Sequence, residues 1–185
     1  MQSEARHEAP QPLAEPGGLV VWVLGRPSAG KSTLATTVRK ELSRRGKACV
    51  VLDGDDIRKS IVPAHDYSPA GRDAFYSTLA RLAATLSAQG IIVVVAATAN
   101  LALYRARARK LCHRYIEVFV DTPADDCAVR DDKGLYAATS TGSVTQLPGK
   151  GAPFEPPEAP DVVAHGGHDR TAVDRIIELV TFQVS

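Results

Sequence analysis

Short apolar runs alternate along the chain with longer stretches in which apolar residues recur every three or four positions. The apolar runs predict strands at residues 19–24, 48–52, 91–97, 115–120 and 161–164. The amphipathic stretches predict helices at residues 32–45, 69–89, 101–112, 123–129 and 170–182. The run at 91–97 is continuous and rich in β-branched residues, which is typical of a parallel strand covered on both faces.

This alternation favours an α/β fold, a three-layer sandwich in which a five-stranded parallel sheet carries helices on both faces. Ligands of such sheets bind where the strands end, so the residues that follow each strand are candidates for chemistry. We interpret residues 53–68 as a polar loop. Residues 131–160 are rich in Gly, Pro, Ser and Thr without an apolar period, which predicts a lid loop over the site.

The length and composition narrow the class of protein. With 185 residues, the chain suffices for a single domain, which we place at 19–185 behind a disordered leader at 1–18. Its 22 basic and 21 acidic side chains nearly balance, which disfavours nucleic acid or an anionic membrane as the main partner. The longest apolar run, at 90–99, is about half of what a membrane span needs.

Cysteines and histidines indicate a reduced, metal-free interior. The widely spaced Cys49, Cys112 and Cys127 lie among apolar residues, which predicts core thiols in a cytoplasmic protein. The closest histidine pair lies in the sequence H-G-G-H at 165–168. Because this segment lacks a further ligand at metal-binding spacing, we interpret it as a polar loop and assign no structural metal.

The most informative motif is G-R-P-S-A-G-K-S-T at residues 25–33, a complete phosphate-binding loop between a predicted strand and a predicted helix. Its glycines let backbone N–H groups surround phosphates, and the following helix directs its positive end at them. Lys31 would reach the β- and γ-phosphate oxygens, and the Ser32 hydroxyl would hold Mg²⁺. The motif predicts a P-loop NTPase domain that binds ATP through Gly25, Ser28, Ala29, Gly30, Lys31, Ser32 and Thr33.

A second motif, D-G-D-D-I-R at residues 53–58, directly follows the second predicted strand. Phosphoryl transfer requires a carboxylate near the acceptor hydroxyl or the metal, and cations that hold an anionic acceptor. Asp53 is the candidate for the general base or for an outer-sphere partner of Mg²⁺, and Arg58 for a bidentate anion contact. An acidic surface turn is the alternative interpretation.

Together these residues resemble the adenylylsulfate kinases, P-loop enzymes that phosphorylate the 3′-hydroxyl of adenosine 5′-phosphosulfate. The resemblance covers residues 18–165 and implies Mg-ATP as the phosphoryl donor, a nucleotide acceptor and a role in sulfate activation. Besides the two motifs above, it rests on Tyr67-Ser68-Pro69 with Arg72, and on E-V-F-V-D-T-P at 117–123. The latter string continues to Cys127, Arg130, Asp131 and K-G-L-Y at 133–136, and P-F-E-P-P at 153–157 is also similar to the family.

The resemblance also implies roles for individual residues. Asp53 would be the base, and Arg130 would pack against the adenine of ATP through a cation–π contact. Tyr67 takes the place of a Phe that stacks near the acceptor's adenine, although an ordinary loop anchor is the alternative. Arg72 would contact the phosphosulfate side unless it pairs with Asp66 or Asp73. The implied acceptor pocket includes Asp55, Arg58, Arg72 and Lys133.

The departures from the family are concentrated around the acceptor and the lid. Phe75 stands where the family has Asn, and its place on an apolar helix stripe equally suits the core. Ala99 and Asn100 replace Ser-Pro, A-A-T-S at 137–140 replaces Lys-Lys-Ala-Arg, and Leu147 opens a segment that replaces Phe-Thr-Gly-Ile-Asp. Lys150 or the basic run at 105–110 could supply replacement charge, but we expect that run to be a solvated helix face.

Three functions are compatible with the sequence. The favoured one is an adenylylsulfate kinase with a divergent lid. The second is a kinase of the same scaffold acting on another nucleotide or phosphorylated metabolite. The third is a non-catalytic nucleotide-binding module, which the joint presence of Lys31, Ser32, Asp53 and Arg58 disfavours. The resemblance also implies a homodimer.

Overall fold

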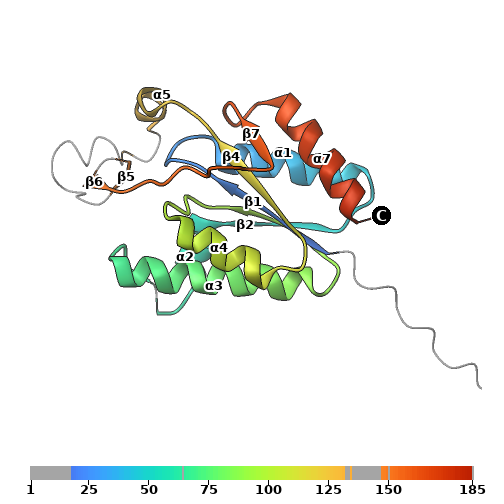
Figure 1. The fold of residues 1–185 in the computed structure, drawn as a ribbon, viewed down its shortest axis with the longest axis horizontal. Coiled ribbons are helices and arrows are strands. Elements are labelled where there is room, and N and C mark those ends of the chain that lie inside the picture. Colours follow the sequence, from blue (N-terminus) through green and yellow to red (C-terminus); the bar gives the residue numbers. More distant parts are fainter. Residues whose placement is uncertain (1–17, 64, 132–133, 135–146, 150, 185) are drawn as a thin grey trace, which may run out of the picture.

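A computed structural model describes residues 18–63, 65–131, 134, 147–149 and 151–184. Five parallel strands form the central sheet (Figure 1). They are β1 (Leu19–Leu24), β2 (Cys49–Asp53), β3 (Ile92–Ala96), β4 (Tyr115–Val120) and β7 (Val162–Ala164), in the spatial order β2-β3-β1-β4-β7. Every neighbouring pair is parallel, so the predicted five-stranded parallel sheet is confirmed.

Helices cover both faces of this sheet (Figure 1). On one face α1 (Lys31–Arg44) packs with α7 (Arg170–Gln183), and on the other α3 (Pro69–Ser87) packs with α4 (Ala102–Leu111). Because side chains of a strand point alternately to its two faces, β1 feeds both cores. Val21 and Val23 belong to the α1/α7 cluster, whereas Val20, Trp22 and Leu24 belong to the α3/α4 cluster. The predicted three-layer arrangement is therefore confirmed.

The expected polar loop after β2 is wrong over one segment, because α2 (Gly54–Ser60) begins there. The Asp53 carboxylate caps this helix by accepting the Asp55 N–H at 3.0 Å. Asp55 and Asp56 lie in its first turn and Arg58 and Lys59 in its last, which complements the helix dipole. The seven residues of α2 are too few to show an apolar period. The signals in the sequence that could have predicted this helix are the capping residue Asp53 and the order of acidic before basic residues.

Two small elements lie inside the predicted lid region, and one helix precedes it. α5 (Ala124–Val129) confirms the short helix predicted after β4. β5 (Leu147–Pro148) and β6 (Gly151–Ala152) form a separate two-stranded pair that was not predicted. The rest of the lid, at 132–133 and 135–146, lies outside the described residues, as do Lys150 and the leader up to residue 17.

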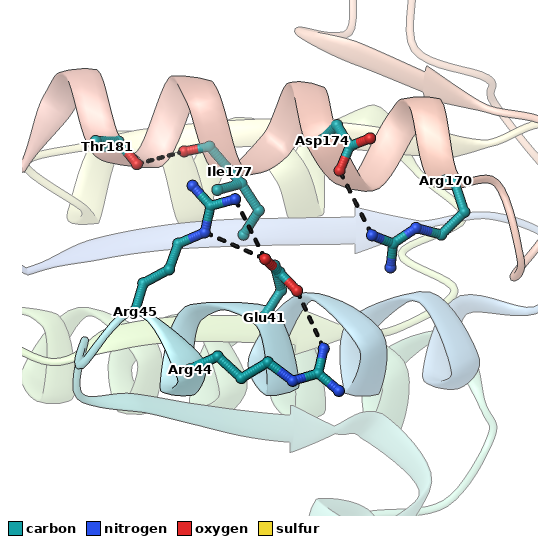
Figure 2. A network of polar contacts seen from close by, with 7 residues as sticks. All are labelled: Glu41, Arg44, Arg45, Arg170, Asp174, Ile177 and Thr181. Atoms are coloured by element: carbon teal, nitrogen blue, oxygen red, sulfur yellow. Dashed lines mark hydrogen bonds and ion pairs between the residues drawn. The ribbon is translucent and has the colours of Figure 1, made fainter.

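Apolar packing, rather than surface charge, holds α1 against α7. Figure 2 shows Glu41 accepting hydrogen bonds from Arg44 and Arg45, and Arg170 paired with Asp174. Each of these ion pairs joins residues three or four positions apart, and exposed pairs of this kind contribute little. Fully or almost fully buried side chains fill the interface beneath them, among them Leu34, Val38, Ile176 and Ile177.

The basic run on α4 is only in part the solvated face that we expected, because Arg109 and Lys110 are exposed but Arg105 is buried. Arg105 is only 4% exposed and lies 3.9 Å from the buried Glu117 of β4, while Arg109 approaches Glu117 and Asp161 at 3.9 and 3.5 Å. Arg107 pairs with Asp73 of α3 at 3.0 Å. Burial raises the pKa of Glu117, and the two arginines oppose that effect. Because a buried carboxylate requires counter-charges, these arginines fasten α4 to the sheet and to α3.

The three cysteines are free thiols, as the sequence predicted. Cys112 and Cys127 are buried and Cys49 is partly buried, and all three are free. Burial raises the pKa of Cys49 and of Cys112 to about 11, so both are protonated thiols at neutral pH. No helix in the described part of the chain is both long enough and apolar enough to cross a bilayer.

Candidate active site

The loop after β1 has the shape that a phosphate-binding motif requires. Gly25 and Gly30 have φ angles of 155° and 100°, and Gly30 caps the N-terminus of α1. A Cβ at Gly25 would lie 2.7 Å from the Val120 carbonyl oxygen, and one at Gly30 would lie 2.6 Å from the Gly167 nitrogen. Only glycine fits at these two points, where other backbone segments approach the loop. Ser28 also has a positive φ, of 61°.

The structure brings Lys31, Ser32 and Asp53 to the same edge of the sheet. The Lys31 ammonium donates to the Arg26 carbonyl oxygen at 2.7 Å, at the mouth of the loop. The Ser32 hydroxyl donates to Asp53 Oδ2 at 2.5 Å, while Oδ1 of the same carboxylate caps α2. Asp53 is therefore fixed between the first turn of α1 and the start of α2. Thr33 follows on the exposed side of α1.

The donor atoms at this point suit Mg²⁺. A hydroxyl and a carboxylate oxygen in direct contact are hard oxygen ligands, and Mg²⁺ in nucleotide sites commonly uses one or two such groups plus phosphate oxygens. Within the described residues, no group of three or more His, Cys, Asp or Glu side chains could hold a metal by itself. Ser32 and Asp53 are thus the residues that could hold Mg²⁺ together with a bound nucleotide.

Arg58 is held in place by backbone carbonyls and aromatic rings. Its guanidinium donates to the carbonyl oxygens of His65 and Asp66 at 2.9 and 3.0 Å. The guanidinium carbon lies 3.8 Å from the ring centroid of Phe75 and 4.6 Å from that of Tyr67. Burial lowers the pKa of Arg58 from its ordinary value. A cation fixed in this way is preorganised to bind an anion.

Arg72 and Tyr67 lie next to Arg58. Arg72, only 8% exposed, donates from Nε to the Tyr67 carbonyl oxygen at 2.9 Å, and its guanidinium carbon lies 5.5 Å from the Tyr67 ring centroid. Tyr67 as a whole residue is 59% exposed, which leaves it accessible to a ligand. Phe75 is 2% exposed and packs edge-on against Tyr76, so it belongs to the core and reaches the site through Arg58. Asp55 is exposed on α2.

The segment after β3 connects the acceptor side to the residues that follow β6. Ala99, with a φ of 41°, donates its N–H to the Tyr76 hydroxyl oxygen at 2.9 Å, and its carbonyl accepts from Arg105 at 2.9 Å. The buried Asn100 donates its amide to the Pro153 carbonyl oxygen at 2.9 Å. The backbone carbonyl oxygen of Asn100 accepts a hydrogen bond from the Glu155 N–H at 2.8 Å. Residues 99–100 are thereby locked to residues 153–155.

Leu147, which was predicted to contact the acceptor, has other surroundings. Leu147 is 4% exposed and lies in the apolar cluster shared by α1 and α7. Lys133 lies outside the described residues.

A cavity of about 370 Å³ lies beside the phosphate-binding loop. The Thr122 hydroxyl in its wall donates to the Ala29 carbonyl oxygen at 2.9 Å, which ties the cavity to the loop. Arg130, expected beside the adenine of ATP, is one of its lining residues. The full lining is Asp121, Thr122, Pro123, Asp126, Arg130 and His165.

The H-G-G-H segment contributes to this region in a way that the sequence analysis missed. It forms a loop as expected, but His165 lines the cavity and Gly167 packs directly on the phosphate-binding loop. A Cβ at Gly167 would lie 2.6 Å from the Gly30 carbonyl oxygen and 2.9 Å from the Thr33 Cβ. Two adjacent glycines at the end of the last predicted strand were the signal that could have revealed this contact.

The fold and this site together define a class. A phosphate-binding loop between β1 and α1, with Lys31 at its mouth and Ser32 in contact with Asp53, is the nucleotide site of a P-loop phosphotransferase. A family model described as adenylylsulphate kinase matches residues 17–165. The chain belongs to the adenylylsulfate kinase family.

Individual relatives agree with this assignment. An adenylyl-sulfate kinase of Paraburkholderia xenovorans (strain LB400) is 37% identical over 147 residues, which cover 79% of this chain and 82% of the relative. One of Synechococcus sp. (strain JA-3-3Ab) is 36% identical over 163 residues, covering 88% and 90%. The solved Mycobacterium tuberculosis APS kinase CysC in complex with AMPPNP and APS has a TM-score of 0.84 at 34% identity, covering 90% of this chain and 99% of that one.

The packing of Gly167 on the phosphate-binding loop generates a prediction. Gly167→Ala should raise the Kd for ATP at least about tenfold and lower the free energy of unfolding by about 1–3 kcal/mol, because the new methyl group displaces Gly30. Titration calorimetry and denaturant unfolding measure the two quantities.

The matched control is Gly46→Ala, at a position with φ of 71° and open space around the added methyl group. This variant should lose about 1 kcal/mol of stability through backbone strain while its ATP affinity stays unchanged. Wild-type ATP affinity in Gly167→Ala would show that the loop does not depend on this contact.

Proposed function

We propose that this protein transfers the γ-phosphoryl group of ATP to the 3′-hydroxyl of adenosine 5′-phosphosulfate, giving 3′-phosphoadenosine 5′-phosphosulfate. Membership of the adenylylsulfate kinase family supports this function, as does the similarity to a solved relative bound to AMPPNP and APS. The observation that carries it in this chain is the contact between Ser32 and Asp53, which joins the phosphate-binding loop to the acceptor-side motif. We also propose a cytoplasmic location.

Each residue of the donor side has a defined task in this proposal. Lys31 leaves the Arg26 carbonyl and contacts the β- and γ-phosphate oxygens, while the loop N–H groups hold the phosphates. Ser32 would hold Mg²⁺ and Asp53 would contact it through water, and the ion would supply positive charge beside the phosphate oxygens. The adenine of ATP occupies the cavity beside the loop and packs on Arg130.

The acceptor side orients the hydroxyl for in-line attack. Asp53 accepts a hydrogen bond from the acceptor hydroxyl and takes its proton during transfer. Arg58 and Arg72, both buried and fixed beside Tyr67, bind the acceptor's anionic groups while the Tyr67 ring stacks on its base. Asp55, Lys133 and the segment at Ala99 and Asn100 remain predicted contributors to this pocket.

A second candidate is a kinase of the same scaffold that acts on another nucleotide or phosphorylated metabolite. Phe75 favours this candidate, because the family has Asn at this position, whereas the buried Phe75 ring offers a substrate no polar contact. A non-catalytic role is disfavoured because Lys31 lies at the mouth of the same loop that carries Ser32, and Ser32 is in direct contact with Asp53. A homodimer and closure of the predicted lid remain proposals.

The function is tested by ADP release from Mg-ATP with and without adenosine 5′-phosphosulfate. We expect acceptor-dependent ADP formation at micromolar acceptor concentration. Lys31→Ala should reduce its rate at least about a hundredfold because the developing charge loses its cation. Lys40→Ala, an exposed lysine on α1, is the control and should keep the wild-type rate. Background ADP release by the wild type would direct the search to other nucleotide acceptors.

The role of Asp53 generates a separate prediction. Asp53→Asn should lower kcat by a factor of about 10²–10⁴ while the KM for ATP changes less than about threefold, because the base is lost and the donor contacts persist. Asn caps a helix as well as Asp does, so α2 should remain folded. Asp56→Asn, in the same helix and exposed, is the matched control. An unchanged kcat in Asp53→Asn would remove Asp53 as the base.

A further inference from the structure

Arg26 is a second cation inside the phosphate-binding loop, at the position that follows Gly25. Its backbone carbonyl receives the Lys31 ammonium at 2.7 Å, which places the residue at the mouth of the loop. No role for its side chain follows from the motif, which leaves this position variable. The structure shows where that side chain goes.

The Arg26 side chain extends from the loop toward Gly149 and Phe154. Its guanidinium carbon lies 4.9 Å from the ring centroid of Phe154. On the same side chain, Nε would be 3.2 Å from a Cβ added at Gly149, so this segment passes close to the arginine. The guanidinium is therefore held against the residues on the acceptor side of the loop.

The position of Phe154 places Arg26 near the segment that follows β3, on the proposed acceptor side. Phe154 lies between Pro153 and Glu155, the two residues whose backbones are hydrogen-bonded to Asn100 after β3. β3 and β1 are parallel neighbours in the sheet, so the segment at Asn100 and the phosphate-binding loop follow adjacent strands at the same edge of the sheet. The Arg26 guanidinium consequently lies between the donor loop and the loop that follows β3.

Arg26 differs from the arginines of α4 in its ion-pair partners. Arg105, Arg107 and Arg109 all form ion pairs with carboxylates. Within the described residues, Arg26 has no carboxylate at ion-pair distance, and its buried Nε lacks a hydrogen-bond partner. A buried, unpaired guanidinium nitrogen is unfavourable unless a ligand satisfies it. Phosphate and sulfate oxygens match the planar fork of an arginine, so the ligand that this site fits is an oxyanion.

We propose that Arg26 binds the anionic phosphosulfate group of the acceptor, and thereby sets the enzyme's selectivity for an anionic nucleotide. The proposal rests on the proposed function. The donor phosphates already have Lys31 and the loop N–H groups, whereas the Arg26 guanidinium is turned to Phe154 and the acceptor side. Arg105, Arg107 and Arg109 are engaged in ion pairs, whereas Arg26 is a cation that can assist Arg58 and Arg72.

The test compares steady-state kinetics of Arg26→Gln, Arg26→Lys and the wild type, with ATP and adenosine 5′-phosphosulfate varied in turn. Arg26→Gln should raise the KM for the acceptor about 30-fold and leave the KM for ATP within about twofold, because one charge-assisted contact to the acceptor is lost. Arg26→Lys should recover part of that loss. Arg39→Gln, at an exposed arginine of α1, should match the wild type.

Added guanidinium chloride provides a readout that a purely structural role would not move. At low millimolar concentration it should lower the acceptor KM of Arg26→Gln and leave that of the wild type unchanged. Thermal unfolding establishes that each variant is folded, and Arg26→Lys carries the test if Arg26→Gln is not.

The outcomes separate the two proposals. Absence of acceptor-dependent ADP release in the wild type overturns the proposed function, and this inference with it. An active wild type with an unchanged acceptor KM in folded Arg26 variants overturns the inference alone. Equal increases in the KM for ATP and for the acceptor also overturn it, because Arg26 would then support the shape of the loop.

Discussion

The hydrogen bond from the Ser32 hydroxyl to the Asp53 carboxylate links two parts of the chain that are far apart in sequence. One oxygen of Asp53 receives Ser32 at the start of α1, and the other caps α2, so a single carboxylate fixes the relative positions of two helix N-termini. The phosphate-binding loop precedes α1, and Asp55 and Arg58, the residues proposed to bind the acceptor, lie on α2. The geometry between phosphoryl donor and acceptor therefore depends on this one contact.

Around that contact, hydrogen bonds and ring contacts hold arginine side chains in place on the proposed acceptor side. Arg58 is held by two carbonyl oxygens and two aromatic rings. Arg105 donates a hydrogen bond to the Ala99 carbonyl oxygen, in the segment that follows β3. The counter-charge for Arg105 is Glu117, inside the fold. An ion network in the core thus supports the loop after β3, while Arg58 and Arg26 keep donors for ligands. Preorganised cations of this kind favour transfer of a charged group, since they need no rearrangement during the reaction.

The fold was largely predictable because its signals are local and periodic. Continuous β-branched runs predicted buried parallel strands, and the motif at residues 25–33 predicted the loop between β1 and α1. α2 was missed because its seven residues carry no apolar period. Arg105 was misjudged because its counter-charge, Glu117, comes from a distant strand. Gly167 packs on Gly30, and His165 lines the same cavity as Arg130, and no pattern around residues 165–168 specifies either arrangement.

The central claim is that this site moves the γ-phosphoryl group of ATP onto the 3′-hydroxyl of adenosine 5′-phosphosulfate. The most direct measurement is to supply ATP labelled in the γ-phosphoryl group and to identify the labelled product by mass spectrometry and phosphorus NMR. We expect the label in a 3′-phosphomonoester of the intact phosphosulfate nucleotide. A label found only in inorganic phosphate, or at another position of the acceptor, would contradict it.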